Sequence, residues 1–248
     1  MKKFLKWFAI ILGGLILLAI IMGLIVHEKL PAGKSGPEAE ALAQKMTEAV
    51  NKEAWDTTRY VQWTFMEMHD FLWNKEAQLV QVEWNDNRVI LDEKTQEGMA
   101  WSEGEAVEGE AKAKLLQQAW SLFCNDSFWL NAPVKAFDPG TSRSVVDLDN
   151  GEKGLLVTYT GGGVTPGDSY LWLLDNSGLP KAWKMWVKII PIGGVETSWS
   201  DWIELPTGAK LATSHKGTLG TLRLSNIRGA MSLQELGIEE DPFSLISQ

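Results

Sequence analysis

The sequence offers few residues that could carry out catalysis or bind a metal. It contains three histidines and one cysteine, and it lacks Gly-x-Ser-x-Gly, phosphate-loop, His-Glu-x-x-His and Cys-x-x-Cys patterns. Glu67, His69 and Asp70 carry metal-ligating groups, but alternation along a strand places Asp70 opposite the other two, and no second histidine lies nearby. We therefore predict no enzymatic activity, no catalytic residue, no metal site and no cofactor. Cys124 lies among Leu122, Phe123 and Phe128, which predicts a buried, apolar thiol.

The tryptophans are the remaining functional signal. Five of the thirteen lie between Asp168 and Trp202. A concave surface lined by tryptophan and other large apolar side chains is typical of a site for an apolar ligand. The alternative is that these indoles simply fill a core. The candidate pocket-lining residues are Trp63, Trp84, Trp172, Trp183, Met185 and Trp199.

Three consecutive predicted strands position most of these candidates. The strand 168–175 is apolar on both faces, so both of its faces must be covered. Asn176-Ser177-Gly178 predicts a turn into a return strand that Pro180 opens. A third strand is expected from Val195 to Ile203, after the bend at 191–194. We expect all three in the middle of a sheet.

The rest of the chain surrounds these strands with an alternation of helices and strand meanders. Helical periodicity begins at Pro37, and the period changes to two from Thr58 to Trp101. A second helix is predicted over 107–124, with Asp126 capping one further turn before Pro133. Strands then continue to Ile227. The fold class is α+β, a single large curved antiparallel sheet forming an incomplete barrel of about nine or ten strands, packed by two main helices.

The N-terminus predicts a membrane anchor. Residues 7–26 carry no charge and are long enough to span a bilayer as a transmembrane helix. Lys2, Lys3 and Lys6 precede this run and place the N-terminus in the cytoplasm, with a cleaved signal peptide as the alternative. The predicted organisation is a cytoplasmic N-terminus 1–6, an anchor 7–26, a linker 27–36, a soluble domain 37–236 and a C-terminal tail 237–248 that we expect to be mobile.

Charge narrows the choice of partners. Without the three N-terminal lysines, the chain has 20 basic and 32 acidic residues, a formal charge of −12. A surface of that sign argues against nucleic acid or an anionic membrane surface as a partner. The membrane itself remains a partner through the N-terminal helix.

Two blocks and the order of elements carry a resemblance. The blocks 126–133 (DSFWLNAP) and 164–172 (VTPGDSYLW) are similar to an uncharacterised family of membrane-anchored bacterial envelope proteins. The order helix, meander, helix, longer meander over residues 37–236 resembles the LolA/LolB-like superfamily of outer-membrane lipoprotein carriers and receptors. That resemblance implies an incomplete barrel whose concave apolar face holds acyl chains. The membrane anchor departs from the freely shuttling carriers.

These observations lead to two alternative functions. The first is a single-pass protein of the bacterial inner membrane, with its C-terminal domain in the periplasm. That domain would bind a lipid, lipoprotein or other apolar ligand non-covalently in a tryptophan-rich concave face. The second is a structural or scaffolding domain that docks another envelope protein and has no ligand cavity.

Overall fold

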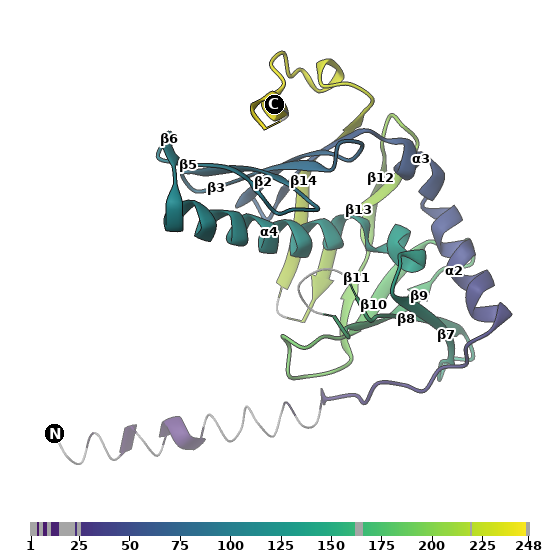
Figure 1. Cartoon of the computed structure of the whole chain (residues 1–248). Helices are drawn as coiled ribbons and strands as arrows, with labels where there is room; N and C mark the ends of the chain where they lie inside the picture. The colour runs from purple at the N-terminus through teal and green to yellow at the C-terminus, as the bar shows by residue number, and fades with distance from the viewer. Residues whose placement is uncertain are drawn as a thin grey trace.

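A computed structural model describes residues 4, 7, 8, 11–14, 23, 26–161, 166–218 and 220–246. Within this part of the chain, fourteen strands form one open, curved antiparallel sheet (Figure 1). The strand order is β6-β5-β4-β3-β2-β1-β14-β13-β11-β10-β9-β8-β7, with β12 paired to β13 outside this path. The predicted class of sheet is confirmed, whereas the predicted nine or ten strands were too few.

The first half of the sheet is a meander. Its strands are β1 (Tyr60–Phe65), β2 (His69–Asn74), β3 (Leu79–Trp84), β4 (Asn87–Asp92), β5 (Gly98–Ser102) and β6 (Glu105–Val107). Neighbouring strands pair in regular register, for example Trp63 opposite Phe71. The chain turns from β1 to β2 through Met66 and Glu67, which both have positive φ.

The second half contains the other eight strands. They are β7 (Thr141–Asp147), β8 (Lys153–Tyr159), β9 (Ser169–Leu174), β10 (Pro180–Trp186), β11 (Val195–Ser198), β12 (Ser200–Glu204), β13 (Lys210–Gly217) and β14 (Gly220–Ala230). The predicted hairpin is confirmed, with Trp172 of β9 opposite Trp183 of β10. β14 pairs with both β13 and β1 and so joins the two halves.

The prediction of one continuous strand from Val195 to Ile203 was wrong. The strand breaks at Trp199, whose backbone N–H donates to the Lys181 carbonyl and whose side chain is buried. Asp201 then has a φ of 54°, which changes the alternation. As a result Trp202 packs against the core while Ile203 is exposed. The Trp199 indole is thus buried at the break between the two short strands β11 and β12.

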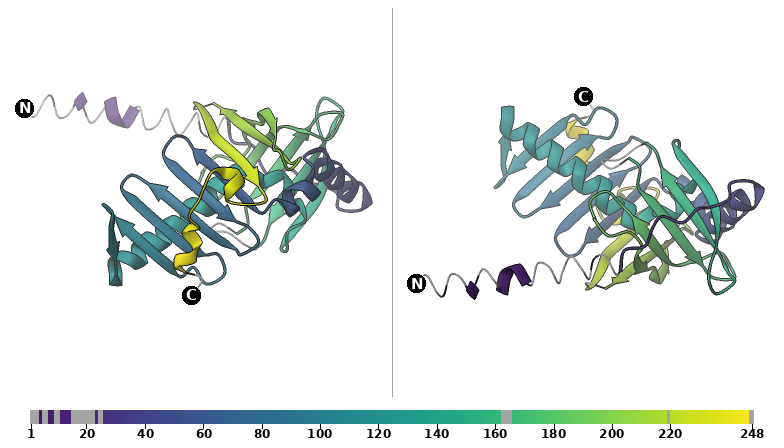
Figure 2. Two further views of the ribbon diagram at one scale, coloured as in Figure 1. Left: turned by 90° about the horizontal axis from the view of Figure 1, so that it is seen from above. Right: turned by 90° about the horizontal axis from the view of Figure 1, so that it is seen from below.

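Helices cover one face of the sheet. The helix α2 (Pro37–Ala49) contacts β7 and β8, and the short α3 (Lys52–Thr57) follows it. Asn51 separates them with a φ of 54°, and its side chain accepts from the Ala54 N–H at 3.3 Å. The long helix α4 (Gly109–Asn131) crosses β3, β4 and β5 and reaches β13 (Figure 2).

The expected end of the second helix near Cys124 was also wrong. α4 runs without a break through Asn125 and Asp126 to Asn131, and the 3-10 helix η1 (Ala132–Phe137) follows, containing Pro133. Asp126 does not cap a separate turn, because its carboxylate faces the sheet and pairs with His69. The polar Asp126 therefore remains within the helix, where His69 of β2 is its partner.

Two cores lie beneath these helices. The larger is packed between β1–β4 and α4 around side chains such as Trp63, Phe71 and Phe123, and it extends to β13 and β14. The second lies between β8–β10 and the group formed by α2, η1 and the end of α4, around Trp172, Trp183 and Trp199. The predicted helical cover over a tryptophan-rich sheet is therefore present.

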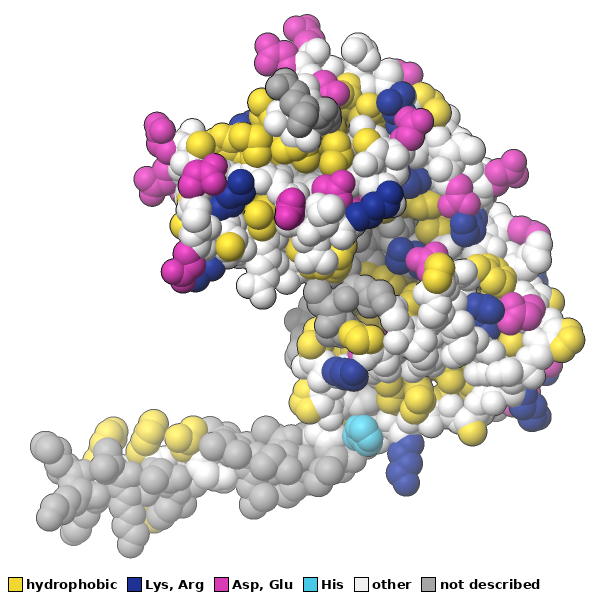
Figure 3. All heavy atoms as spheres, viewed as in Figure 1, with side chains coloured by type: hydrophobic (Ala, Val, Ile, Leu, Met, Phe, Trp, Pro, Cys, Tyr) yellow, Lys and Arg dark blue, Asp and Glu magenta, His cyan; other side chains and the backbone are white. Residues whose placement is uncertain are grey.

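The opposite face carries the C-terminal segment. The Ser232 hydroxyl donates to Glu235 Oε1 at 3.1 Å and accepts from the Glu235 N–H at 3.4 Å, and Gly237 follows the 3-10 helix η2 (Gln234–Leu236) with a φ of 77°. Phe243, in η3 (Pro242–Leu245), is 1% exposed beside Tyr60, Leu72 and Ile90. Figure 3 shows hydrophobic side chains between this segment and the strands. The C-terminal segment packs on the sheet because its few apolar side chains cover the face that the helices leave open.

The linker preceding α2 also lies on this outer face of the sheet, where it contacts β10. Glu28 accepts from Lys184 at 2.8 Å, and its backbone carbonyl accepts from Trp186 Nε1 at 2.8 Å. Lys34 then pairs with Val145 on the edge strand β7. The predicted anchor, 7–26, lies largely outside the described residues. Among the residues that are described, no helix has the length and apolar character needed to cross a membrane.

Candidate ligand pocket

A pocket of about 490 Å³ lies between the second half of α4 and the strands β8–β10. We call it the α4 pocket. Helix α4 contributes one stripe, because Trp120, Cys124, Ser127 and Asn131 recur at helical spacing. The remaining lining side chains come from η1 and the loop after it, from β2, from the turn after β4, and from β8–β10 with the segment following β10.

One end of the α4 pocket is aromatic and aliphatic. The alternation of the strands turns Tyr170 of β9 and Trp183 and Met185 of β10 toward the helices. Trp183 is the centre of this end, with its ring centroid 4.6 Å from that of Tyr170 and 4.9 Å from that of Trp129. The other apolar lining residues at this end are Phe128, Tyr159, Val187, Ile189 and Ile190.

Of the six predicted residues, Trp183 and Met185 line the α4 pocket. Trp172 and Trp199 pack behind Trp183, with ring centroids 4.9 Å and 5.0 Å from it, and belong to the same core. Trp63 and Trp84 lie in the other core, where Trp63 stacks on Phe71 at 4.5 Å. The structure thus places two candidates at the pocket and four in the cores. That any of them binds a ligand stays a prediction.

Sequence reasoning missed the helical wall of the pocket. Trp120, Phe128, Trp129 and Asn131 of α4, and Lys135 of η1, were not among the candidates. The signal was present, since the stripe starting at Trp120 continues at helical spacing past Asn125 and Asp126. It was hidden by the expectation that the helix ended before this point.

Several buried polar atoms of the pocket walls have no hydrogen-bond partner within the described part of the chain. They are Asn131 Oδ1, the Tyr159 hydroxyl and Trp183 Nε1. Burial raises the pKa of both Tyr159 and Tyr170 well above the usual tyrosine value, so both phenols are neutral at ordinary pH. Burial also raises the pKa of the Cys124 thiol to about 12, so the thiol is a weak nucleophile. Cys124 lies in apolar surroundings as predicted, but it is only partly buried and lines the pocket.

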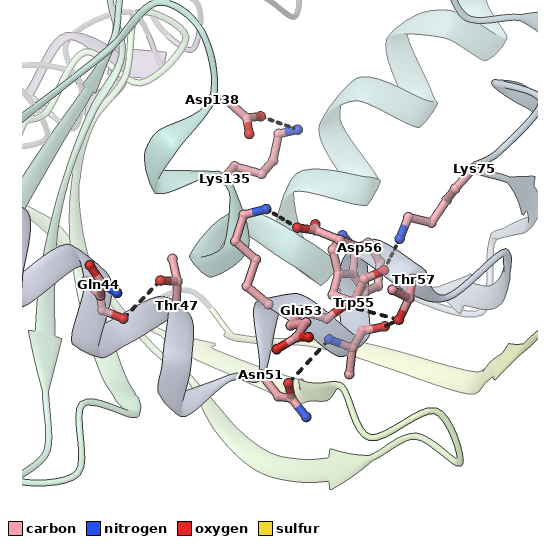
Figure 4. Close-up of polar contacts among 12 residues, drawn as sticks. Gln44, Thr47, Asn51, Glu53, Trp55, Asp56, Thr57, Lys75, Lys135 and Asp138 are labelled. Carbon is pink, nitrogen blue, oxygen red and sulfur yellow. Dashed lines mark hydrogen bonds and ion pairs between the residues drawn. The ribbon is translucent and has the colours of Figure 1, made fainter.

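The other end of the α4 pocket carries charge. Trp73 Nε1 donates to Glu93 Oε1 at 2.5 Å, and both residues line the pocket with Trp120 and Phe123. Burial raises the pKa of Glu93, an effect that the Trp73 hydrogen bond opposes. Lys135 forms an ion pair with Asp138 at 2.8 Å (Figure 4).

Lys75 lies next to this end. Its ammonium group is 4.2 Å from the centroid of the Trp55 ring and 5.9 Å from that of Trp73, and it donates to the Trp55 carbonyl (Figure 4). Burial lowers its pKa to about 8. The aromatic faces partly replace the water that the ammonium group has lost.

His69 and Asp70, which carry metal-ligating groups, each pair with a different side chain. His69 Nδ1 lies 2.7 Å from Asp126 Oδ2, and Asn125 donates to Asp126 Oδ1 at 2.8 Å. Asp70 instead accepts from Thr64 at 2.5 Å. In the described ranges, no three His, Cys, Asp or Glu side chains group as they would around a metal ion. Burial raises the pKa of Asp126, opposed by its hydrogen bonds from Asn125 and His69.

Comparison with known proteins gives one distant structural likeness. No protein-family profile matches the sequence, and no curated protein matches it. Among solved structures, a DUF1329 family protein from Desulfovibrio piger aligns with 85% of this chain and 100% of its own, at 12% identity and a TM-score of 0.42. At that identity and score we draw nothing from it about family or function. The expected kinship with lipoprotein carriers and receptors stays an expectation.

Proposed function

We propose that this protein binds a lipid or another apolar envelope molecule non-covalently in the α4 pocket, without catalysis. The observation that carries the proposal is the pocket itself. Its volume of about 490 Å³ falls within the range of roughly 300–1,000 Å³ typical of small-molecule sites. Most of its 22 lining residues are aromatic or aliphatic, and seven are polar or charged. We keep the resemblance to the LolA/LolB-like incomplete barrel within this proposal, on the order of elements alone.

The physics of such a pocket favours a flexible chain or a ring system over a charged solute. Each methylene transferred from water into the pocket contributes about 0.8 kcal/mol. Binding must also overcome several kcal/mol of lost motional freedom. An acyl chain that fills the aromatic end around Trp183 offsets this cost.

We further propose that residues 7–26 anchor the protein in the bacterial inner membrane, with the domain in the periplasm. The support is the uncharged run itself, preceded by Lys2, Lys3 and Lys6. Compartment-reporting fusions after Gly36 and after Gln248 should both report the non-cytoplasmic side. A cytoplasmic signal from either fusion would contradict the proposed location.

Binding is tested on the full chain, kept in solution by an amphipathic polymer so that no free detergent competes. Native mass spectrometry should show co-purifying lipid, and a fluorescent acyl probe should bind saturably. Ile190→Glu places a charge at the half-buried rim and should weaken probe binding at least tenfold, because the carboxylate is desolvated when the probe enters.

The matched control is Ile203→Glu, because Ile203 is 37% exposed and lies outside the pocket lining. It should bind the probe like the parent protein. If the parent protein shows neither co-purifying lipid nor saturable probe binding, the ligand-binding proposal fails. The scaffolding alternative then takes its place.

A further inference from the structure

We propose that the end of the α4 pocket formed by Trp73, Glu93 and Trp120 binds a protonated amine. The ligand would then be a single-chain amphiphile with an amino head, its chain in the aromatic end around Trp183. This inference rests on the proposed function and specifies the chemical class of the ligand. It is argued from three features of that end of the pocket: an unpaired carboxylate, a group of aromatic rings and the balance of charge.

In the described part of the chain, the carboxylate of Glu93 forms no direct ion pair, although Lys135 and Lys75 act on it from farther away and lower its pKa. Its Oε1 accepts one hydrogen bond, from Trp73 Nε1, and within the described residues no Lys, Arg or His nitrogen lies within 4.0 Å of it. The two nearby lysines are otherwise engaged, because Lys135 pairs with Asp138 and Lys75 is held at Trp55. A half-buried carboxylate with only one donor leaves room for a strong, charge-assisted hydrogen bond.

Aromatic rings stand beside this carboxylate. The Phe123 ring lies 5.1 Å from Trp73 and 6.0 Å from Trp120, centroid to centroid, and all three residues line the pocket. Indole faces attract cations, most strongly where water is excluded. The protein already uses Trp73 in this way, since the Lys75 ammonium lies 5.9 Å from its ring centroid. A carboxylate beside indole rings is a suitable arrangement for an ammonium group.

The charged groups at this end favour a cation over an anion, because the basic ones are already engaged. Glu93 and Asp138 are acidic and Lys135 is basic there, Lys75 lies beside the pocket, and Asp168 belongs to the end near Tyr170. Lys135 would be the natural partner of a carboxylate or phosphate head, but Asp138 already neutralises it at 2.8 Å. An anionic head would also have to approach Glu93, and like charges in a partly desolvated site repel strongly.

The experiment compares three twelve-carbon probes that differ only in the head: dodecylamine, dodecanol and dodecanoate. Their affinities for the full chain in amphipathic polymer are measured by displacement of the fluorescent acyl probe, below the concentration at which they form micelles. We expect dodecylamine to bind about tenfold more tightly than dodecanol, and dodecanoate to bind most weakly.

Glu93→Gln removes the charge and keeps an oxygen that can accept from Trp73. It should bring the affinity for dodecylamine down to that for dodecanol, and leave dodecanol binding unchanged, which also shows that the variant is folded. The matched control is Glu97→Gln, an exposed residue close in sequence that does not line the pocket. It should retain the preference for the amine.

The outcomes separate this inference from the proposed function. Equal affinities for the three heads, tightest binding of dodecanoate, or an unchanged amine preference in Glu93→Gln would each overturn the amine site while leaving ligand binding intact. If none of the three probes binds to the parent protein, the proposed function and this inference fail together.

Discussion

His215 makes the stability of this protein depend on pH in a predictable direction. It lies on β13 and is 1% exposed, with its ring centroid 4.3 Å from Trp199 and 5.3 Å from Trp129. Its Nδ1 is 3.3 Å from the Ser198 carbonyl, and the backbones of Ser198 and Trp129 both oppose the effect of burial on its pKa. Burial lowers the pKa of His215 from 6.5 to about 4. The neutral ring is therefore the form that the folded protein accommodates.

The direction of this pH dependence follows from the difference in the His215 pKa between the folded and unfolded states. Above pH 6.5 the imidazole is neutral in both states, and His215 contributes no pH dependence. As the pH falls from 6.5 toward 4, His215 binds a proton in the unfolded chain but stays neutral in the folded protein. The free energy of unfolding then decreases by about 1.4 kcal/mol per pH unit, or about 3 kcal/mol over the whole interval.

The perturbation is His215→Gln, which removes the titration. The free energy of unfolding is measured by urea denaturation, followed by tryptophan fluorescence, between about pH 7 and pH 4.5. Whatever the cost of the substitution near neutral pH, the parent should lose about 2 to 3 kcal/mol relative to the variant on acidification. Leu211→Ala, buried on the same strand, is the control and should lose stability equally at all pH values. Parallel curves for His215→Gln and the parent would refute the reasoning.

Three further predictions concern the sheet and the buried polar pair. Gly98→Ala should cost about 1–3 kcal/mol in thermal unfolding, because its Cβ would lie 1.9 Å from the Ile90 carbonyl oxygen, whereas Gly217→Ala, with nothing closer than 3.4 Å, should cost less. Met185→Pro should destabilise the domain by about 3 kcal/mol or more, since β10 is paired on both sides; a variant that melts like the parent would contradict the central position of this strand. Asp126→Leu should cost about 1–3 kcal/mol in urea denaturation by leaving His69 Nδ1 without its partner, and a double-mutant cycle with His69→Phe should show coupling between the two residues.

Local signals in the sequence predicted the elements that depend on neighbouring residues. The hairpin of β9 and β10 follows from alternation around Asn176-Ser177-Gly178. The same alternation turned Trp183 and Met185 toward the pocket.

What could not be predicted depends on partners distant in sequence. α4 continues through Asp126 because the buried Asp126 carboxylate pairs with His69, which lies 57 residues earlier in the chain. Without that pairing, the Asn125-Asp126-Ser127 stretch has the composition of a helix end. Because the helix was expected to end there, the part of α4 that lines the pocket was not predicted. The break at Trp199 likewise depends on how the sheet buries one indole, which no local pattern encodes.

The position of β14 has a consequence for the order of folding. Residues 60–65 of β1 pair with residues 224–230 of β14, so the seam of the sheet joins segments from opposite ends of the domain. Such non-local pairing is slow to form, whereas the hairpins within each half join segments close in sequence and can form earlier. Pulse-labelled hydrogen exchange should therefore show protection within β2–β4 and β8–β10 before the β1–β14 pair. Until then β1 is an open sheet edge, able to pair with another chain. The interval before β14 arrives is thus when this protein is most exposed to aggregation.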